Sequence, residues 1–283
     1  MEAEDEKMAI ETKTLNNGVN IPLVGFGTWL IYKKDEVDVA VKAALSFGYR
    51  HIDTAAAYHN ESYVGKAIAE SGIKRSDLFI TSKVPAEIKG YDKCKKAFEA
   101  SIKALGVDYL DLYLIHAPRP WNEMGSDKGY RYDKENVATY LAMEDLLKEG
   151  KIKAIGVSNF DKKDIENLLK NCHVVPAVNQ VEYHPGYRRE DIQKYCEGKG
   201  IAIEAYSPFA HGRVFANQTL IDLAAKYKVG VAELCLKWCL KRGTIALPKS
   251  KDPERIKKNL ELGFDISEPD MEAIDKVDVA GFH

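Results

Sequence analysis

The fold of this chain is indicated most directly by one stretch, Arg50-His51-Ile52-Asp53-Thr54-Ala55-Ala56-Ala57-Tyr58. It predicts a short β-strand that ends in an aspartate, followed by a loop of small residues and then a tyrosine. The alanines leave open space at the strand end, and the carboxylate and the phenol would both face that space. In a barrel of parallel strands such strand ends converge on one face, where active sites lie.

Two later strand-like segments also end in an ionisable residue. Residues 78–83 end at Lys83, and residues 110–116 end at His116. In a parallel barrel these ends would gather Asp53, Tyr58, Lys83 and His116 on the same face. The four side chains are therefore the candidate catalytic residues.

The remaining sequence alternates between short apolar strands and amphipathic helices. Strands are expected at residues 24–28, 51–53, 78–82, 110–115, 152–157, 177–181, 201–205 and 244–247. Helices are expected at residues 35–47, 61–70, 94–105, 140–148, 162–169, 190–199, 220–227, 231–241 and 253–260. The pattern predicts an α/β fold, a (β/α)8 TIM barrel with eight main helices and one extra helix.

An N-terminal β-hairpin is expected between Ile10 and Val24, because Asn16-Asn17-Gly18 is a strong turn signal. The hairpin has no helix partner, so it should cap the closed end of the barrel. No linker or repeat interrupts the chain, which predicts one domain over residues 1–283 with a flexible tail at residues 1–7. No Gly-x-Gly-x-x-Gly follows a strand, which argues against a Rossmann nucleotide site.

The composition excludes several classes of function. Lys and Arg number 41 and Asp and Glu number 43, for a net charge of −2, so a nucleic-acid surface is not expected. No apolar run approaches the roughly 18 residues of a membrane helix, and the N-terminus lacks a signal-peptide core. The five cysteines are scattered, as is typical of a reducing cytosol, and Cys235 and Cys239 are better explained by packing than by metal binding. We expect a cytoplasmic monomer without a metal.

The four candidate residues suit the delivery of a proton to an oxygen. A phenol has an ordinary pKa of about 10, and a nearby ammonium lowers that pKa. Lys83 would supply the ammonium for Tyr58, Asp53 would hold Lys83, and His116 would donate a hydrogen bond to a substrate oxygen. This is half of a carbonyl reduction, and the missing hydride implies a nicotinamide cofactor.

Other interpretations fit parts of the same pattern. A lone Asp at a strand end is often a helix cap, a lone Lys a surface charge and a lone His a structural group. The catalytic interpretation therefore depends on all of these residues occurring together at consecutive strand ends. Lys83 could instead form a Schiff base in a lyase, although a paired Asp53 would keep it cationic. A third alternative is a protein that binds the cofactor without turnover.

Ordered motifs along the chain show a family resemblance. They are Gly25-Phe26-Gly27-Thr28-Trp29, Asp53-Thr54-Ala55-Ala56-Ala57-Tyr58, Lys83, Leu114-Ile115-His116, Gly156-Val157-Ser158-Asn159-Phe160, Asn179-Gln180-Val181-Glu182, Tyr206-Ser207-Pro208 and Leu247-Pro248-Lys249-Ser250. With them the sequence resembles the aldo-keto reductase superfamily over essentially its whole length, and its microbial and protozoal members in particular. The resemblance implies reduction of aldehydes and ketones with NADPH, small aldehydes, 2-oxoaldehydes and diketones among them.

The resemblance also implies roles for individual residues. Tyr58 would be the proton donor, with Lys83 and Asp53 as its tuning pair and His116 orienting the carbonyl substrate. The residues implied in cofactor binding are Thr28, Trp29, Asp53, Ser158, Asn159, Gln180, Tyr206, Ser207, Phe209, Lys249, Ser250, Lys251, Arg255 and Asn259. The residues implied in substrate binding are Trp29, Tyr58, His116 and Trp121.

The residues themselves support two of these assignments, each with an alternative. A phosphate near Lys249 and Ser250 would be stabilised by the Lys charge, the Ser hydroxyl and the dipole of a helix that begins at Pro253. The alternative is that this basic cluster is only a solvated helix start. The loop at residues 117–136 is long enough to be functional, and Trp121 would either close over a pocket or pad the surface.

The chain departs from the family pattern at several positions. Ala117 follows the catalytic His where many members carry Trp, and Lys258 stands where many carry an acid. The segment Phe209 to Thr219 is too short for a long clasp over the cofactor. The sequence ends at His283 soon after the last expected helix, so no long C-terminal lid is expected.

Overall fold

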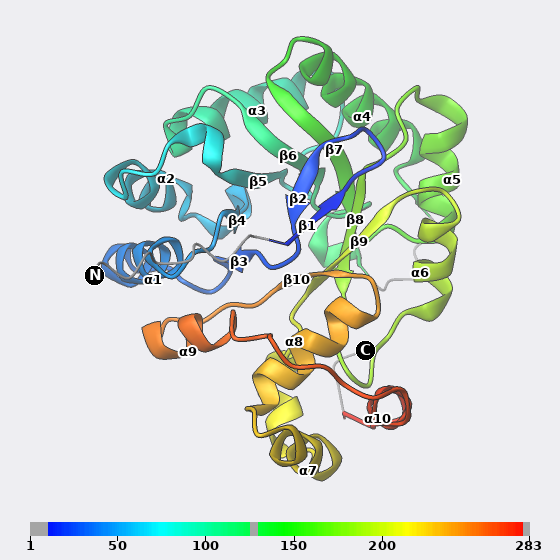
Figure 1. Ribbon diagram of the computed structural model, residues 1–283. Helices are drawn as coiled ribbons and strands as arrows, with labels where there is room; N and C mark the ends of the chain where they lie inside the picture. The colour runs from blue at the N-terminus through cyan, green and yellow to red at the C-terminus, as the bar shows by residue number, and fades with distance from the viewer. Residues whose placement is uncertain (1–10, 125–129, 280–283) are drawn as a thin grey trace.

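A computed structural model describes residues 11–124 and 130–279, and its centre is an eight-stranded parallel sheet (Figure 1). The strands are β3 (Phe26–Gly27), β4 (His51–Asp53), β5 (Phe79–Val84), β6 (Leu110–Ile115), β7 (Ile152–Ser158), β8 (Val178–Glu182), β9 (Ala202–Tyr206) and β10 (Ile245–Leu247). They neighbour one another in chain order, and each is parallel to the next. The predicted (β/α)8 barrel is confirmed.

The sheet curls until its first and last strands meet. Val24 forms an isolated parallel bridge with Ala246, and the Gly25 amide donates to the Ala246 carbonyl at 2.9 Å. Only a glycine fits at this seam, because a Cβ on Gly25 would lie 2.5 Å from His51 Nδ1. The missing side chain lets the two edges approach and nearly close the barrel.

The predicted hairpin is also confirmed. Strands β1 (Thr12–Thr14) and β2 (Asn20–Pro22) pair antiparallel and lie across the barrel in Figure 1. The side-chain amides of Asn16 and Asn17 donate to the carbonyls of Pro176 and Lys153, both at 2.9 Å, near the starts of β8 and β7. The hairpin therefore covers the N-terminal end of the barrel, and the opposite end stays available for a site. The tail predicted at residues 1–7 lies outside the described residues.

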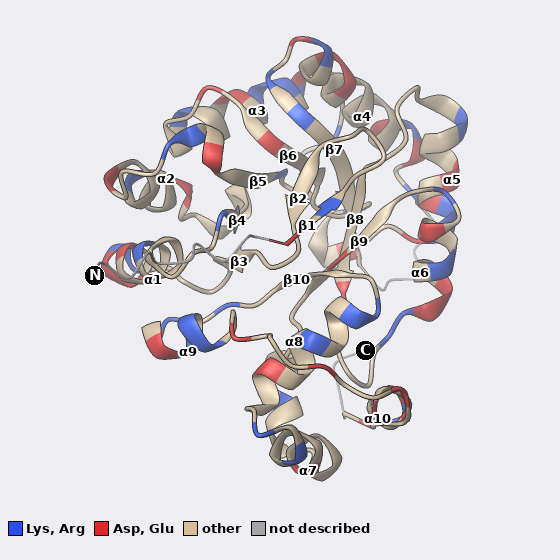
Figure 2. Cartoon of the chain, viewed as in Figure 1, with Lys and Arg blue, Asp and Glu red and all other residues tan. Residues whose placement is uncertain are grey.

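Helices surround the barrel, and the longer ones bury an apolar stripe on their inner side. The helices are α1 (Lys34–Ser46), α2 (Glu61–Glu70), α3 (Tyr91–Leu105), α4 (Asp133–Lys148), α5 (Lys162–Asn171), α6 (Glu190–Glu197), α7 (Gln218–Tyr227), α8 (Val231–Lys241), α9 (Pro253–Lys258) and α10 (Glu268–Asp275). In α1, for example, Val37, Ala40, Val41 and Ala44 are all fully buried. Figure 2 shows basic and acidic residues interspersed along these outer helices.

Helix α4 begins at Asp133, seven residues earlier than the sequence pattern predicts. Its first turns look like a loop because their buried positions are polar. The Asn136 side-chain amide donates to the Pro118 carbonyl at 2.8 Å, and the Thr139 hydroxyl accepts from the Gly90 amide at 2.8 Å. Hydrogen bonds to neighbouring loops stabilise these turns where apolar periodicity would normally be expected.

Helix α10 was not expected from the sequence pattern, so one more helix follows the helix expected to be last. Its signals were a serine at the cap, Ser267, a proline in the first turn, and Met271 and Ile274 three residues apart on one face. The helix is anchored because Asp275 accepts hydrogen bonds from the Trp238 indole at 2.8 Å and from Arg242. The segment after it continues to Val279, which packs against Gly186 in the loop after β8.

Across the described ranges, no helix has the length and apolar character needed to cross a membrane. Those same ranges contain no group of three or more His, Cys, Asp or Glu side chains placed to hold a metal ion. Cys235 and Cys239 lie on the inner face of α8 and are fully buried in the hydrophobic core, in accordance with a packing role.

Candidate active site

The four candidate catalytic side chains meet at the C-terminal end of the barrel. Asp53 ends β4, Lys83 lies in β5, His116 directly follows β6 and Tyr58 lies in the short 3-10 helix after β4. Lys83 Nζ is 2.7 Å from Asp53 Oδ1 and 3.3 Å from Tyr58 Oη. The Thr54 carbonyl accepts a third hydrogen bond from Lys83 at 3.0 Å. The sequence predicted this grouping, and the parallel strand ends produce it.

A residue that sequence reasoning missed holds the loop between Asp53 and Tyr58. The Asn60 side chain is fully buried and donates to the carbonyls of Thr28 and Ile31 at 2.9 and 3.0 Å. Its side-chain oxygen accepts from the Thr54 hydroxyl at 3.0 Å. Asn60 therefore ties the loop after β4 to the loop after β3, which restricts where Tyr58 can lie.

Burial and pairing set the charge states of Lys83 and Tyr58. Burial by itself would lower the pKa of Lys83, but Asp53 and then Tyr58 raise it above its ordinary value, so Lys83 stays cationic. Burial raises the pKa of Tyr58, and this outweighs the lowering by Lys83. The expectation that Lys83 lowers the pKa of Tyr58 below its ordinary value is therefore wrong, because burial has the larger effect. A phenol with a raised pKa keeps its proton at neutral pH, as a proton donor must.

His116 is a neutral imidazole between two aromatic rings. Burial, and then the charges of Lys83 and Lys89, lower its pKa well below the ordinary value. Its ring makes edge contacts with Tyr58 and Trp121, with centroids 5.5 and 5.1 Å apart. Among the described residues, its Nδ1 is buried and finds no hydrogen-bond partner in the protein. Trp121 was expected either to close over a pocket or to pad the surface. It is half-exposed, and its ring contacts the imidazole.

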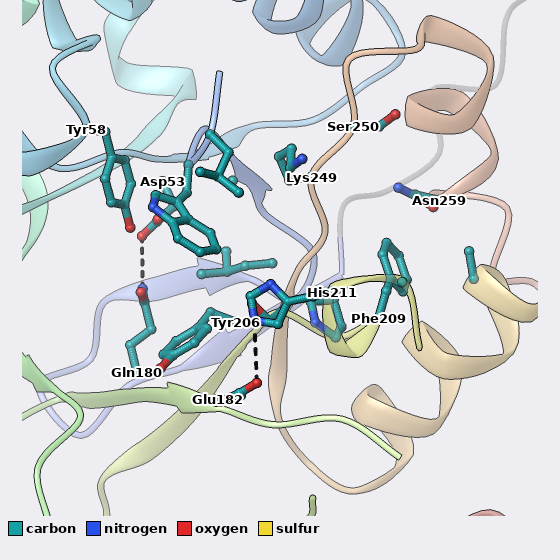
Figure 3. A pocket seen from close by; sticks show the side chains of 18 of the residues that line it. Asp53, Tyr58, Gln180, Glu182, Tyr206, Phe209, His211, Lys249, Ser250 and Asn259 are labelled. Atoms are coloured by element: carbon teal, nitrogen blue, oxygen red, sulfur yellow. Dashed lines mark hydrogen bonds and ion pairs between the residues drawn. The ribbon is translucent and has the colours of Figure 1, made fainter. Parts of the chain in front are cut away.

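A cavity of about 1050 Å³ extends from these residues across the end of the barrel (Figure 3). Its volume is at the upper end for small-molecule sites, which suits an extended ligand. The predicted site residues along its wall are Trp29, Asp53, Tyr58, His116, Trp121, Ser158, Asn159, Gln180, Tyr206, Ser207, Phe209, Lys249, Ser250, Arg255 and Asn259. Lining residues that the sequence analysis did not assign to the site include Glu182, His211, Phe215 and Lys258.

Two predicted cofactor residues do not line the cavity. Thr28 is fully buried behind Asp53, and its hydroxyl donates to the Asp53 carbonyl at 3.0 Å. Lys251 points away, because its ammonium is 2.7 Å from the Glu36 carboxylate on α1. The resemblance implies that Lys251 binds the cofactor, but in this structure its ammonium pairs with Glu36 instead of facing the cavity.

The middle of the cavity carries an ordered set of amide and hydroxyl groups. Asn159 has a left-handed backbone, with φ of 62°. Its side-chain oxygen accepts from the Tyr206 hydroxyl at 2.8 Å, and its amide donates to Ser158 Oγ at 3.0 Å. Gln180 donates to Asp53 Oδ2 at 2.9 Å, as Figure 3 shows. These bonds fix the side chains before any ligand arrives.

The far end of the cavity is cationic, from Lys249, Arg255 and Lys258. The helix that begins at Pro253 was expected to help bind a phosphate, but its first free amides already have a partner. Asp252 caps α9, and its Oδ1 accepts from the amides of Glu254 and Arg255 at 2.9 and 3.2 Å. Since those amides are taken, attraction for an anion at this end must come from the side chains.

The segment after β9 reaches back over the cavity although it is short. The His211 ring makes an edge contact with Trp29, with centroids 5.7 Å apart. His211 Nε2 is 3.7 Å from a Glu182 carboxylate oxygen, drawn as a dashed line in Figure 3. The segment is too short for a long clasp over the cavity, as expected. Its His211 side chain alone reaches Trp29 on one side and Glu182 on the other.

Together these features define a class of protein: a (β/α)8 barrel whose C-terminal end carries a tyrosine–lysine–aspartate cluster and a histidine beside a large cavity with a cationic end. Comparison with known proteins agrees. Residues 23–279 match the model of the Aldo/keto reductase family. Glyoxal reductase of Bacillus subtilis (strain 168) is 45% identical over 266 residues, which cover 94% of this chain and 92% of that protein.

Solved structures give the same result. An aldo/keto reductase from Brucella melitensis superposes with a TM-score of 0.87 and 41% identity, over 95% of this chain and 100% of that one. A Bombyx mori aldo-keto reductase in complex with NADP has a TM-score of 0.85 and 36% identity, over 94% of this chain and 92% of that one. This chain belongs to the aldo/keto reductase family and is an oxidoreductase.

Proposed function

We propose that this protein reduces aldehydes and ketones to alcohols with NADPH, and that small aldehydes, 2-oxoaldehydes and diketones are among its substrates. One observation carries the proposal: the Lys83 ammonium, held by Asp53 at 2.7 Å, lies 3.3 Å from the Tyr58 hydroxyl at one end of a cavity whose other end is cationic. A proton donor and a place for a long anionic cofactor therefore share one space.

Each side chain has a role in this chemistry. A bound nicotinamide would supply hydride to the carbonyl carbon. Tyr58 would donate its proton to the carbonyl oxygen, and Lys83 would stabilise the phenolate that remains. The neutral His116 would donate a hydrogen bond to the same oxygen and orient it. Burial of Lys83 and His116 keeps water away and strengthens these interactions.

The residues along the cavity fit such a cofactor. The amide and hydroxyl groups of Ser158, Asn159 and Gln180 match a carboxamide, and the Tyr206 ring offers a face for the nicotinamide. Lys249 and Arg255 at the other end suit phosphates, with Ser250 as a hydroxyl donor. The cavity's volume of about 1050 Å³ supports a ligand of this length.

The relatives support the substrate class. The similar Bacillus subtilis protein is a glyoxal reductase, and a Saccharomyces cerevisiae relative, 40% identical over 287 residues, is an aldehyde reductase. Trp29 and Trp121 are half-exposed and form apolar walls of the cavity, which favours several small aldehydes over one bulky ketone. The test is loss of NADPH absorbance with glyoxal, methylglyoxal, a diketone and a steroid ketone. Binding of NADPH without turnover of any carbonyl would overturn the proposal.

A Schiff-base lyase is disfavoured by the charge of Lys83. A lysine that attacks a carbonyl must lose its proton, whereas Asp53 and Tyr58 raise the pKa of Lys83 above its ordinary value. Borohydride with a carbonyl substrate should therefore leave no adduct on Lys83.

Arg255→Ala should weaken NADPH binding. The Arg255 side chain is 77% exposed, so its hydrogen bond to a 2′-phosphate should fall at the low end of charge-assisted bonds, about 1.5 kcal/mol or roughly tenfold in affinity. NADH lacks that phosphate and should be affected less. Quenching of protein fluorescence gives both affinities.

Lys251→Ala is the matched control for that variant. It removes the same charge four residues away, but from an ammonium that pairs with Glu36 outside the cavity. It should leave both affinities nearly unchanged. Equal losses for NADPH and NADH in Arg255→Ala would show that Arg255 does not bind the phosphate.

Trp121→Ala should raise KM more than it lowers kcat. Trp121 forms an apolar wall over His116 but has no proton to transfer, so its loss removes substrate contact area, worth roughly fivefold to tenfold in KM. Trp121→Phe keeps an aromatic wall and should be nearly normal in steady-state kinetics. A fall in kcat with constant KM would instead assign Trp121 to the chemical step.

We also propose a monomer in the cytoplasm. The predicted catalytic side chains and the cavity beside them lie within a single chain, so the site needs no second copy to be complete. The five cysteines lie in the described part of the chain and are free, which supports a reducing compartment.

A further inference from the structure

A buried carboxyl group that the proposed mechanism does not use lies beneath the site. Glu204 is the middle residue of β9, fully buried, and it stands opposite Gln180 of β8 in the strand register. Carboxyl groups are rarely buried without a partner, because desolvation is costly. The partner of Glu204 is the Gln180 side chain, whose amide nitrogen donates to Glu204 Oε2 at 2.5 Å.

The same nitrogen also donates to Asp53. Gln180 Nε2 is 2.9 Å from Asp53 Oδ2, while the other Asp53 oxygen accepts from Lys83. A carboxylate in an ion pair only accepts hydrogen bonds, so the Gln180 atom beside it must be the NH2 group. An amide has two N–H donors, and the two acids take both. The amide oxygen is therefore the polar atom that Gln180 has left for a ligand in the cavity.

The charge state of Glu204 suits this role. Burial, and then the neighbouring Asp53, raise its pKa to about 8, so it is a neutral acid at pH 7. Its other oxygen is 3.6 Å from His51 Nε2, and burial lowers the pKa of His51 to about 3, so no cation faces it from there. A neutral acid still accepts from Gln180 and adds no negative charge beside Lys83 and Asp53.

We propose that Glu204 is a positioning residue that holds Gln180 with its amide oxygen toward the cavity, so that the site selects a ligand bearing an N–H donor. In the proposed function that donor is the NH2 of the nicotinamide carboxamide, and the inference rests on that function. Asp53 engages one of the two Gln180 donors and leaves the other free to rotate toward the ligand. Glu204 engages that second donor, so that the amide oxygen is the group Gln180 presents to the cavity.

Two substitutions and two cofactors test this role. Glu204→Gln keeps an acceptor oxygen at the same place, whereas Glu204→Leu removes it and leaves an apolar side chain of similar size. The probes are NADPH and its 3-acetylpyridine analogue, in which a methyl ketone replaces the carboxamide and no N–H remains. Affinities of each protein for each cofactor are measured by quenching of protein fluorescence.

The expected result is a selective loss. Glu204→Leu should bind NADPH about fivefold to tenfold more weakly than the wild type, as expected for one misaligned hydrogen bond, and should bind the analogue within about twofold of the wild type. Glu204→Gln should bind both cofactors like the wild type. If Glu204→Leu fails to fold, Glu204→Met removes the same acceptor with a more adaptable side chain.

Other outcomes separate this inference from the proposed function. Equal losses for both cofactors would mean that Glu204 only supports the barrel, and an unchanged NADPH affinity would mean that Asp53 alone orients Gln180. Either result overturns the inference while the reductase proposal stands. A wild-type protein that binds neither cofactor would overturn the proposed function itself.

Discussion

Replacing Tyr58 with phenylalanine is expected to lower kcat for carbonyl reduction at least a hundredfold or so, the usual contribution of general acid catalysis. The substitution removes one hydroxyl and leaves the ring against His116, whose centroid is 5.5 Å away. Lys83 retains its hydrogen bonds to Asp53 and to the Thr54 carbonyl, so the pocket should keep its shape. NADPH affinity should therefore stay nearly normal.

Separate measurements of turnover and binding check this expectation. Single-turnover loss of NADPH absorbance gives the rate of the chemical step, and fluorescence quenching gives the affinity. Tyr32→Phe is a suitable control, since that phenol is exposed and does not line the cavity. Turnover close to the wild type in Tyr58→Phe would assign the proton to another group.

Lys83→Met should lose turnover to a similar extent by a different route. Tyr58 keeps its hydroxyl, but the phenolate left after proton transfer loses the ammonium 3.3 Å away. Since Lys83 lowers the pKa of Tyr58 against the effect of burial, its removal should raise that pKa further and make the phenol a weaker acid. The loss should appear in kcat as well as in kcat/KM.

The same substitution should destabilise the fold, because it leaves Asp53 buried with its cation removed. Breaking one side of a buried ion pair costs about 3–5 kcal/mol in the free energy of unfolding. The double variant Lys83→Met with Asp53→Asn removes both charges and should recover much of this stability in urea unfolding, but no turnover. Recovery of activity in the double variant would show that Lys83 matters only for folding.

The pH dependence of this ion pair follows from the direction of its shift. The folded-state pKa of Lys83 is raised, so its contribution is complete below the ordinary lysine pKa of about 10.4 and is lost only as the pH rises through the higher folded value. Stability from the pair should therefore be constant around neutral pH. The wild type and Lys83→Met should then differ by the same amount at pH 6 and pH 7, below the pKa of about 8 of the neighbouring Glu204.

Much of this molecule could be predicted from its sequence. The alternation of strands and helices gave the barrel, and Asn16-Asn17-Gly18 gave the hairpin at its closed end. Ionisable residues at three strand ends predicted a cluster that the structure shows, with Lys83 Nζ between Asp53 and Tyr58. These predictions succeeded because the spacing of apolar residues and the residues of a turn can be read within a short stretch of sequence. In addition, parallel strands bring their ends to one face whatever the loops contain.

The errors occurred where polar residues are buried. Asn136 and Thr139 lie in the first turns of α4, and hydrogen bonds to Pro118 and Gly90 replace the apolar stripe that marks a helix in the sequence. Similarly, the side chain of Asn60 ties together the loops after β3 and β4. The partners of these groups are remote in the sequence, so no local pattern reveals them.

The sequence by itself therefore determined the barrel, the family and the identity of the candidate proton donor. The tertiary structure alone decided which cations reach the cavity: Lys249 lines it, whereas Glu36 draws Lys251 away. It also decided that burial outweighs Lys83 in the pKa of Tyr58, and that the Gln180 amide donates to two acids, Asp53 and Glu204. The physical reason is that desolvation and hydrogen-bond direction depend on groups from several strands, which only the closed barrel brings within a few ångströms of one another.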